Sequence, residues 1–146
     1  MTKEWIESIA QGRTGHEIQR RAIQNIYSIH VQKDLIRCNF IVPQSLSDKD
    51  GNWHVGAITT LLDIVGSTAI VTAVGNINVS VYFNISYFAT TKISEEVEIE
   101  AKVLILGYRG KFSLNMVYIR SKVNGELIAV GKQWMFAFDP KRKSRL

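Results

Sequence analysis

The segment SLSDKDGNWHVGAI, residues 45–58, has the pattern of a turn followed by the start of a helix. Asp48 and Gly51 are typical turn residues, and the helix is predicted to begin between Trp53 and Val55. The first N–H groups of a helix have no intrahelical acceptor, and the helix dipole adds partial positive charge there. Such a site can stabilise a carbonyl oxygen that gains negative charge, as an oxyanion hole does. Gly56 allows another group to approach the backbone closely.

A single carboxylate stands inside the apolar run that follows. The run HVGAITTLLDIVGSTAIVTAV covers residues 54–74, and Asp63 lies near its middle. A buried, unpaired carboxylate is strongly unfavourable, so Asp63 needs either a partner or a chemical use. The structural alternative is that Asp63 caps a neighbouring helix or bridges two subunits.

Asp63 lies too far from the helix start for both to act on one group within a single helix. It follows Val55 by eight residues, which at ~1.5 Å per residue is ~12 Å along the axis. Two antiparallel copies of this helix, side by side in a dimer, would place the start of one opposite the middle of the other. The carboxylate is then interpreted as half of a site that a second subunit completes.

The rest of the chain supplies the elements that would position this helix. A helix that is apolar on nearly all sides is normally wrapped by other elements. The fold class that satisfies every segment is α+β, with one antiparallel sheet of about six strands wrapped around one long central helix. The predicted strands, which include the alternating set Phe112, Leu114, Met116 and Tyr118, cover residues 26–33, 35–43, 79–88, 96–105, 111–120 and 127–138.

Length and composition indicate one domain over residues 1–138, with residues 1–25 as an N-terminal helical extension. The net charge is +5, but four of the positive charges lie in the last six residues, 141–146, which leaves +1 for the rest and argues against nucleic-acid binding. Cys38 is expected to be a buried hydrophobe rather than a nucleophile. Asp63 and five Ser or Thr residues argue against a membrane span over 55–74. No spacing of metal ligands is present, so we expect no metal and no bound cofactor.

The tail 139–146 ends in Ser144-Arg145-Leu146 behind KRK. This tripeptide is similar to the Ser-Lys-Leu type of peroxisomal address, with Arg145 in the basic position. We therefore expect a peroxisomal import receptor as a partner and the peroxisome as the location, with the cytoplasm as the alternative.

Three segments of the chain together resemble the hotdog-fold acyl-CoA thioesterases: DKDGNWHVG, VSVYFNISYF and GELIAVGKQWMF. The position of Asp63, nine residues after His54, is part of the same resemblance. The resemblance covers about residues 25–138 and is strongest to the small branch that includes phenylacetate-pathway enzymes and small mammalian acyl-CoA thioesterases. It implies a hotdog fold, hydrolysis of an acyl-CoA thioester to free acid and coenzyme A, and assembly as a homodimer and then a dimer of dimers. Coenzyme A enters only as part of the substrate.

The resemblance also implies roles for individual residues. His54 and Gly56 match the His-Gly-Gly of the helix start, and the backbone N–H of Val55 takes the position that polarises the thioester carbonyl. Asp63 matches the catalytic acid, which activates a water or attacks the carbonyl itself, and Ser80 matches a strand serine near the reacting centre. The segments that hold coenzyme A in the family match the positions of Tyr87, Lys92, Gly107, Arg109 and Gly110, of which Lys92 and Arg109 suit its phosphates.

Two positions depart from the family pattern. Val55 replaces the usual middle glycine, and Asp48 stands where an asparagine typically assists the acid. A carboxylate at position 48 near Asp63 would raise the pKa of one of the pair. These departures motivate an alternative function, a non-catalytic acyl-CoA-binding or scaffolding hotdog protein. A dehydratase on the same fold is a third hypothesis.

Overall fold

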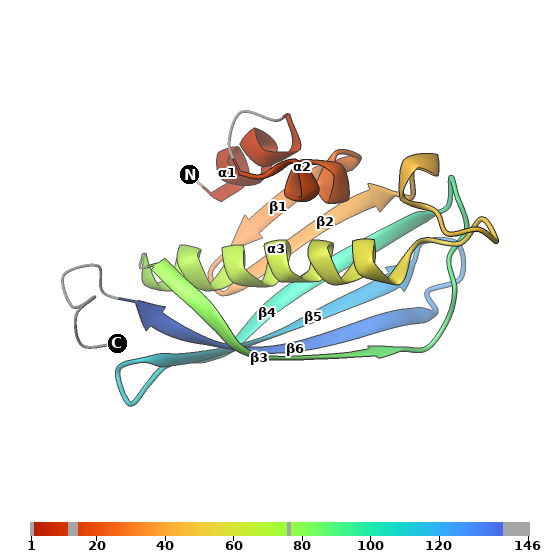
Figure 1. The fold of residues 1–146 in the computed structure, drawn as a ribbon. Coiled ribbons are helices and arrows are strands. Elements are labelled where there is room, and N and C mark those ends of the chain that lie inside the picture. Colours follow the sequence, from red (N-terminus) through yellow and green to blue (C-terminus); the bar gives the residue numbers. More distant parts are fainter. Residues whose placement is uncertain (1, 12–14, 76, 139–146) are drawn as a thin grey trace.

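A long helix lies across a curled antiparallel sheet in the computed structural model (Figure 1). The structure describes residues 2–11, 15–75 and 77–138. The sheet has six strands in the order β1-β2-β4-β5-β6-β3, so β1 and β3 form its edges. This confirms the predicted hotdog architecture. The strands are β1 (Ile26–Gln32), β2 (Leu35–Ile41), β3 (Ile77–Tyr87), β4 (Glu96–Tyr108), β5 (Phe112–Ser121) and β6 (Leu127–Phe138).

Helix α3 (Val55–Val74) coincides with the predicted apolar helix. It begins after His54, which is the N-cap, and ends at Gly75, whose φ of 71° is the left-handed conformation that glycine adopts readily. The helix is long and apolar enough to span a bilayer by length and composition, but half of it is buried against the rest of the protein. Its buried side chains, such as Leu61 and Leu62, pack on the sheet. The sheet therefore covers apolar side chains of α3 that lipid would surround in a membrane helix.

On strand β5, polar as well as apolar side chains face α3, so the strand departs from the simple pattern of apolar side chains inside and polar side chains outside. Ser113, Asn115, Val117 and Ile119 are buried on the face toward α3, whereas Phe112 and Tyr118 are half-buried on the opposite face. The apolar alternation seen in the sequence thus belongs mainly to the outer face. Polar side chains occupy inner positions of this strand because they are hydrogen-bonded there.

Strand β4 is longer than predicted. It continues to Tyr108, three residues past the predicted end at Ile105, and the β4–β5 hairpin turns through Gly107 and Gly110, which have φ values of 68° and 72°. The register of β4 with β5 shifts near Ile105, which allows the ladder to resume at Tyr108 and Phe112. The hairpin therefore projects from the end of the sheet where α3 ends (Figure 1).

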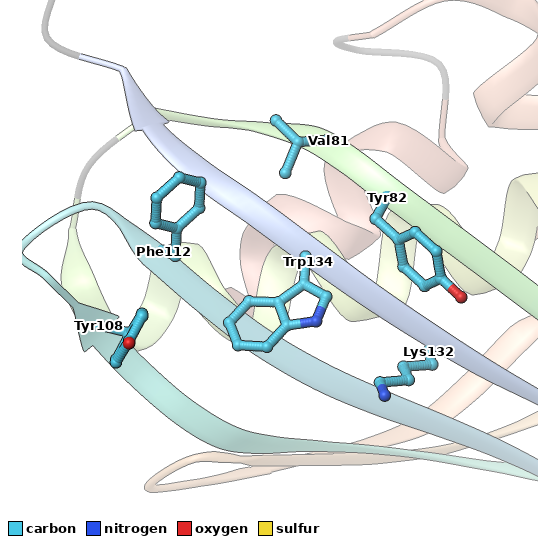
Figure 2. Close-up of a pocket in the computed structure, with 6 residues that line it drawn as sticks. All are labelled: Val81, Tyr82, Tyr108, Phe112, Lys132 and Trp134. Carbon is cyan, nitrogen blue, oxygen red and sulfur yellow. The ribbon is translucent and has the colours of Figure 1, made fainter.

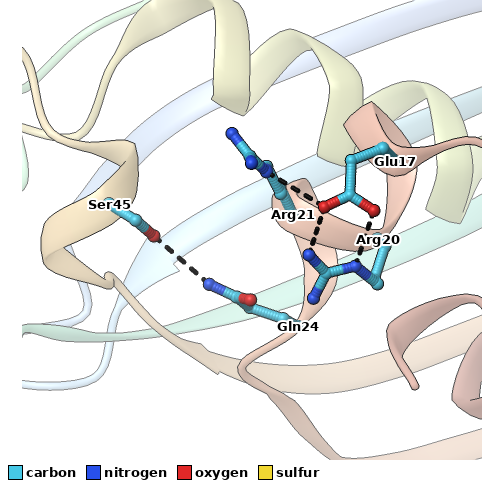
Figure 3. A network of polar contacts seen from close by, with 5 residues as sticks. All are labelled: Glu17, Arg20, Arg21, Gln24 and Ser45. Atoms are coloured by element: carbon cyan, nitrogen blue, oxygen red, sulfur yellow. Dashed lines mark hydrogen bonds and ion pairs between the residues drawn. The ribbon is translucent and has the colours of Figure 1, made fainter. Parts of the chain in front are cut away.

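Two short helices precede the sheet: α1 (Thr2–Ala10) and α2 (Glu17–Ile23). On α2, the side chains of Arg20 and Arg21 bind Glu17, and the hydrogen bond from Arg20 is the main cause that lowers the pKa of Glu17 to about 2 (Figure 3). Gln24 donates from Nε2 to Ser45 Oγ at 3.2 Å, which links the end of α2 to the short 3-10 helix η1 (Gln44–Leu46). The tail 139–146, with its predicted targeting tripeptide, lies outside the described residues.

Candidate active site

Two backbone N–H groups at the start of α3, those of Val55 and Ala57, have no acceptor among the described residues. His54 accepts the Gly56 N–H through Nδ1 at 2.9 Å, and its carbonyl accepts the Ile58 N–H at 3.0 Å. The Val55 N–H has no acceptor among the described residues, and the Val55 side chain is 56% exposed. Val55 is in ordinary helical conformation, so this position needs no glycine for its backbone. The helix start therefore presents a free donor at the positive end of the dipole.

The loop before α3 is built around Asp48. Its Oδ1 accepts the N–H groups of Asp50 at 2.8 Å and Asn52 at 3.0 Å, and it thereby closes the turn that leads into the helix. Within one protomer, this side chain stabilises the loop. Lys92 is exposed and pairs through its backbone with Asn52, two residues before His54. A lysine thus lies next to the helix start.

Asp63 is half-buried and held by two polar neighbours. Gln133 donates from Nε2 to Asp63 Oδ1 at 2.6 Å, and Ser80 donates from Oγ to the same oxygen over 3.4 Å. Gln133 Nε2 also donates to Ser80 Oγ at 2.6 Å. Both hydrogen bonds to the carboxylate reach Oδ1, and Oδ2 accepts none from the described residues. The structure thus brings Asp63 and Ser80 together, from α3 and β3, and leaves one carboxylate oxygen free.

Gln133 and Asn115 were missed in the sequence. Both are fully buried, and Asn115 donates from Nδ2 to Gln133 Oε1 at 2.9 Å. The available signal was their placement among apolar residues in the middle of two predicted strands, LNMV and GKQWM. A buried amide in the centre of a sheet needs a partner, as Asp63 does.

The remaining candidates lie apart from Asp63 within one protomer. The Tyr87 hydroxyl bonds Thr59 Oγ1 at 2.7 Å, so Tyr87 ties the end of β3 to the first turns of α3. Gly107, Arg109 and Gly110 form the β4–β5 hairpin, where the Arg109 guanidinium lies 5.6 Å from the centre of the Tyr108 ring. This hairpin is at the opposite end of the sheet from the helix start (Figure 1). Within one chain, the candidate site residues therefore do not all lie in one place.

Other reactive groups do not form a second site in the described ranges. Burial raises the pKa of the Cys38 thiol to about 12, so this cysteine is a poor nucleophile near neutral pH. Among residues 2–11, 15–75 and 77–138, no group of three or more His, Cys, Asp or Glu side chains could hold a metal ion.

Comparison with known proteins agrees with this geometry. The model of the family described as "Thioesterase superfamily" matches residues 50–109. The mouse acyl-coenzyme A thioesterase 13 is 31% identical over 113 residues, which cover 77% of this chain and 79% of the relative. The chain belongs to the thioesterase superfamily. Two solved structures of thioesterase superfamily member 2 are each 26% identical and cover 93% of this chain: the zebra fish protein, with a TM-score of 0.84 over 95% of its chain, and the mouse protein, with 0.77 over 96%.

The part that matches the superfamily model contains most of the candidate site. Residues 50–109 include the helix start at His54, the carboxylate of Asp63, Ser80 on β3 and Lys92. Gln133 and Asn115 lie beyond the matched residues, on the two strands that complete the inner wall of the site.

Proposed function

We propose that this protein is an acyl-CoA thioesterase, which hydrolyses an acyl-CoA thioester to a free acid and coenzyme A. The observation that carries the proposal is Asp63, a carboxylate set in an apolar helix and bonded through one oxygen only. The free Val55 N–H at the helix start supplies the complementary group, a donor for an oxyanion. The similarity to mouse acyl-coenzyme A thioesterase 13 supports the same activity.

The chemistry follows from these two groups. The Val55 N–H donates to the thioester carbonyl oxygen, and Asp63 Oδ2 takes a proton from a water molecule that attacks the carbonyl carbon. The C–O bond forms as the C=O π electrons move to oxygen, and the tetrahedral intermediate then collapses with cleavage of the C–S bond. The thiolate of coenzyme A takes up the proton from Asp63. Direct attack by Asp63 would instead form a mixed anhydride that water then hydrolyses.

The proposed active unit is a homodimer formed through the β3 edge. Residues 77–88 carry no charged residue and no proline, although charges and proline normally protect an exposed edge strand. Val79 and Val81 on this edge are 46% and 54% exposed. Beside it, the accessible side of α3 carries small side chains that would let a second helix approach closely: Gly56, Thr60 and Ser67. A second copy of the chain therefore suits this surface best.

The separation of the candidate residues supports the same dimer. Lys92 and the helix start lie at one end of the sheet, whereas Arg109 lies in the hairpin at the other end. A two-fold axis across antiparallel β3 edges would bring the Arg109 of one protomer toward the helix start of its partner. The same operation places the Val55 N–H of one protomer opposite Asp63 of the other. Lys92 and Arg109 could then both contact coenzyme A phosphates.

Pairing of two such dimers would use the outer face of the sheet. Because Gln133 is buried toward α3, its strand neighbours Lys132 and Trp134 point away from the helix. Figure 2 shows them in an open, largely aromatic hollow of about 400 Å³, lined by Val81, Tyr82, Tyr108, Phe112, Lys132 and Trp134. Apolar surface of this kind favours association, and it adjoins β3, so we propose that a second dimer covers it.

Thiol release from a panel of straight-chain and aromatic acyl-CoA thioesters tests the proposed activity on the purified protein. We expect release from at least one class of thioester, and the preferred class identifies the acyl group. Acyl-CoA binding without release across the panel would contradict the proposal and favour the alternative of a non-catalytic binding protein.

Import into the peroxisome through Ser144-Arg145-Leu146 stays a prediction. It rests on the sequence of the tail alone, which is outside the described residues. The cytoplasm remains the alternative location.

A further inference from the structure

Gln133 is a fully buried residue that donates a hydrogen bond to the candidate acid, Asp63. It is 0% exposed on β6, and its Nε2 donates to both Asp63 Oδ1 and Ser80 Oγ at 2.6 Å. An amide nitrogen has two hydrogens, so these two bonds use its full donor capacity. The carboxylate and the serine hydroxyl are thereby held at a fixed separation from one side chain.

Asn115 determines which end of the Gln133 amide faces Asp63. Asn115 Nδ2 donates to Gln133 Oε1 at 2.9 Å and to the carbonyl oxygen of Gly66 at 3.2 Å. Because a donor occupies the oxygen end of the Gln133 amide, the nitrogen end must face Asp63 and Ser80. A reversed amide would place two donors against each other at Asn115 and two acceptors against each other at Asp63.

Gly66 makes room for this pair of amides under α3. A Cβ atom at position 66 would lie 2.6 Å from Asn115 Oδ1 and 2.9 Å from Gln133 Oε1. Glycine inside a helix is less favourable than alanine by about 1 kcal/mol. Its presence here, one turn after Asp63, is explained by the close approach of the two side chains from β5 and β6.

The arrangement leaves a defined set of free atoms for chemistry. Asp63 Oδ1 is occupied by Gln133, so the carboxylate cannot rotate without losing a short hydrogen bond, and Oδ2 remains available. The Ser80 hydroxyl oxygen accepts from Gln133, so its proton can be donated to Asp63 or to a bound reactant. From its position on β6, Gln133 thus orients both the Asp63 carboxylate and the Ser80 hydroxyl.

We infer that Gln133 is a positioning residue for hydrolysis, which aims the free oxygen of Asp63 at the reacting water or carbonyl, and that Asn115 sets the orientation of the Gln133 amide. This inference rests on the proposed thioesterase function. Gln133 acts through Asp63 and Ser80, so its contribution is expected in turnover rather than in substrate affinity.

The test uses Gln133→Met, which keeps the length and volume of the side chain but removes the donor, and Asn115→Leu, which removes the group that orients it. Both are expected to lower kcat by about 10–100-fold with little change in KM, since a small misplacement of a catalytic group has an effect of this size. Gln24→Met is the matched control, because the Gln24 side chain bonds only Ser45 among the described residues and has no hydrogen bond to Asp63, Ser80 or Asn115. Gln133→Leu serves as a second variant if Gln133→Met does not fold.

A role limited to stability predicts a different result. The Gln133 variants would then melt at lower temperature, yet at temperatures where they remain folded their kcat would equal that of the unmodified protein. That outcome overturns the inference while leaving the thioesterase function in place, provided that Asp63→Asn is inactive.

A second readout does not depend on turnover. In ¹⁵N NMR spectra, the side-chain NH₂ resonances of Gln133 are expected to shift in both Asp63→Asn and Asn115→Leu. If the Gln133 resonances do not shift in one of these two variants, the inference is overturned. If the protein releases no thiol from any thioester, the proposed function fails, and with it the catalytic part of the inference, whereas shifted resonances would still establish the orientation of the amide.

Discussion

Asp63→Asn is expected to reduce thiol release by about 10²–10⁴-fold, the range typical of a lost general base. The variant should fold normally, because the asparagine side chain retains a carbonyl oxygen that can accept from Gln133 Nε2 in the place of Oδ1. Its amide nitrogen then occupies the position of the free Oδ2, where it can neither take a proton from water nor attack a carbonyl. The measurement is kcat for the preferred acyl-CoA, together with the thermal unfolding midpoint.

Asp34→Asn is the matched control for this substitution. Asp34 lies in the β1–β2 turn with a φ of 61°, a conformation that asparagine also adopts, so both stability and turnover should be unchanged. Near-normal turnover in Asp63→Asn would rule out Asp63 as the catalytic acid and would leave it a structural role only.

Val55→Pro is expected to lower kcat by about 10²–10³-fold, the usual effect of removing one oxyanion donor. The substitution removes the backbone N–H and leaves the helix in place, because Val55 is the first residue of α3 and proline is favoured at that position. The preceding His54 has φ −66° and ψ 132°, which a residue before proline adopts without strain. Steady-state kinetics and circular dichroism measure the two effects separately.

Val55→Ala is the control for the shape of the side chain. It keeps the N–H and removes the exposed isopropyl group, so its kcat should remain within a few-fold of the original. If Val55→Pro hydrolyses the thioester as fast as Val55→Ala, the free N–H of Val55 does not bind the oxyanion.

Whether a site residue could be predicted from the sequence depended on how clearly its type differs from the types of its sequence neighbours. Asp63 was visible because it is the one carboxylate in a long apolar run, and the turn residues before it marked the helix start. The central helix and the six strands were predictable for the same reason, since their apolar patterns and turn residues are strong. These patterns depend on short-range sequence alone.

The polar network behind Asp63 was not predictable in this way. Strand β5 carries apolar residues on both faces, so alternation could not show that Asn115 points toward α3 and Met116 away from it. On β6, Gln133 lies between Lys132 and Trp134, so alternation likewise could not show that Gln133 points toward α3. The inner face of each strand is decided by the tertiary register, which aligns Asn115 with Gln133 across the β5–β6 ladder.

The central claim is that one active site uses the helix start of one protomer and Asp63 of its partner. Mixing the two inactive variants, Asp63→Asn and Val55→Pro, under conditions that allow subunits to exchange tests it most directly. A mixed dimer then contains one intact site and one doubly altered site, so an equal mixture should recover about a quarter of the original activity, because about half of the dimers are mixed. No recovery, with mixed dimers demonstrated by mass spectrometry, would contradict the account and place the complete site within one chain.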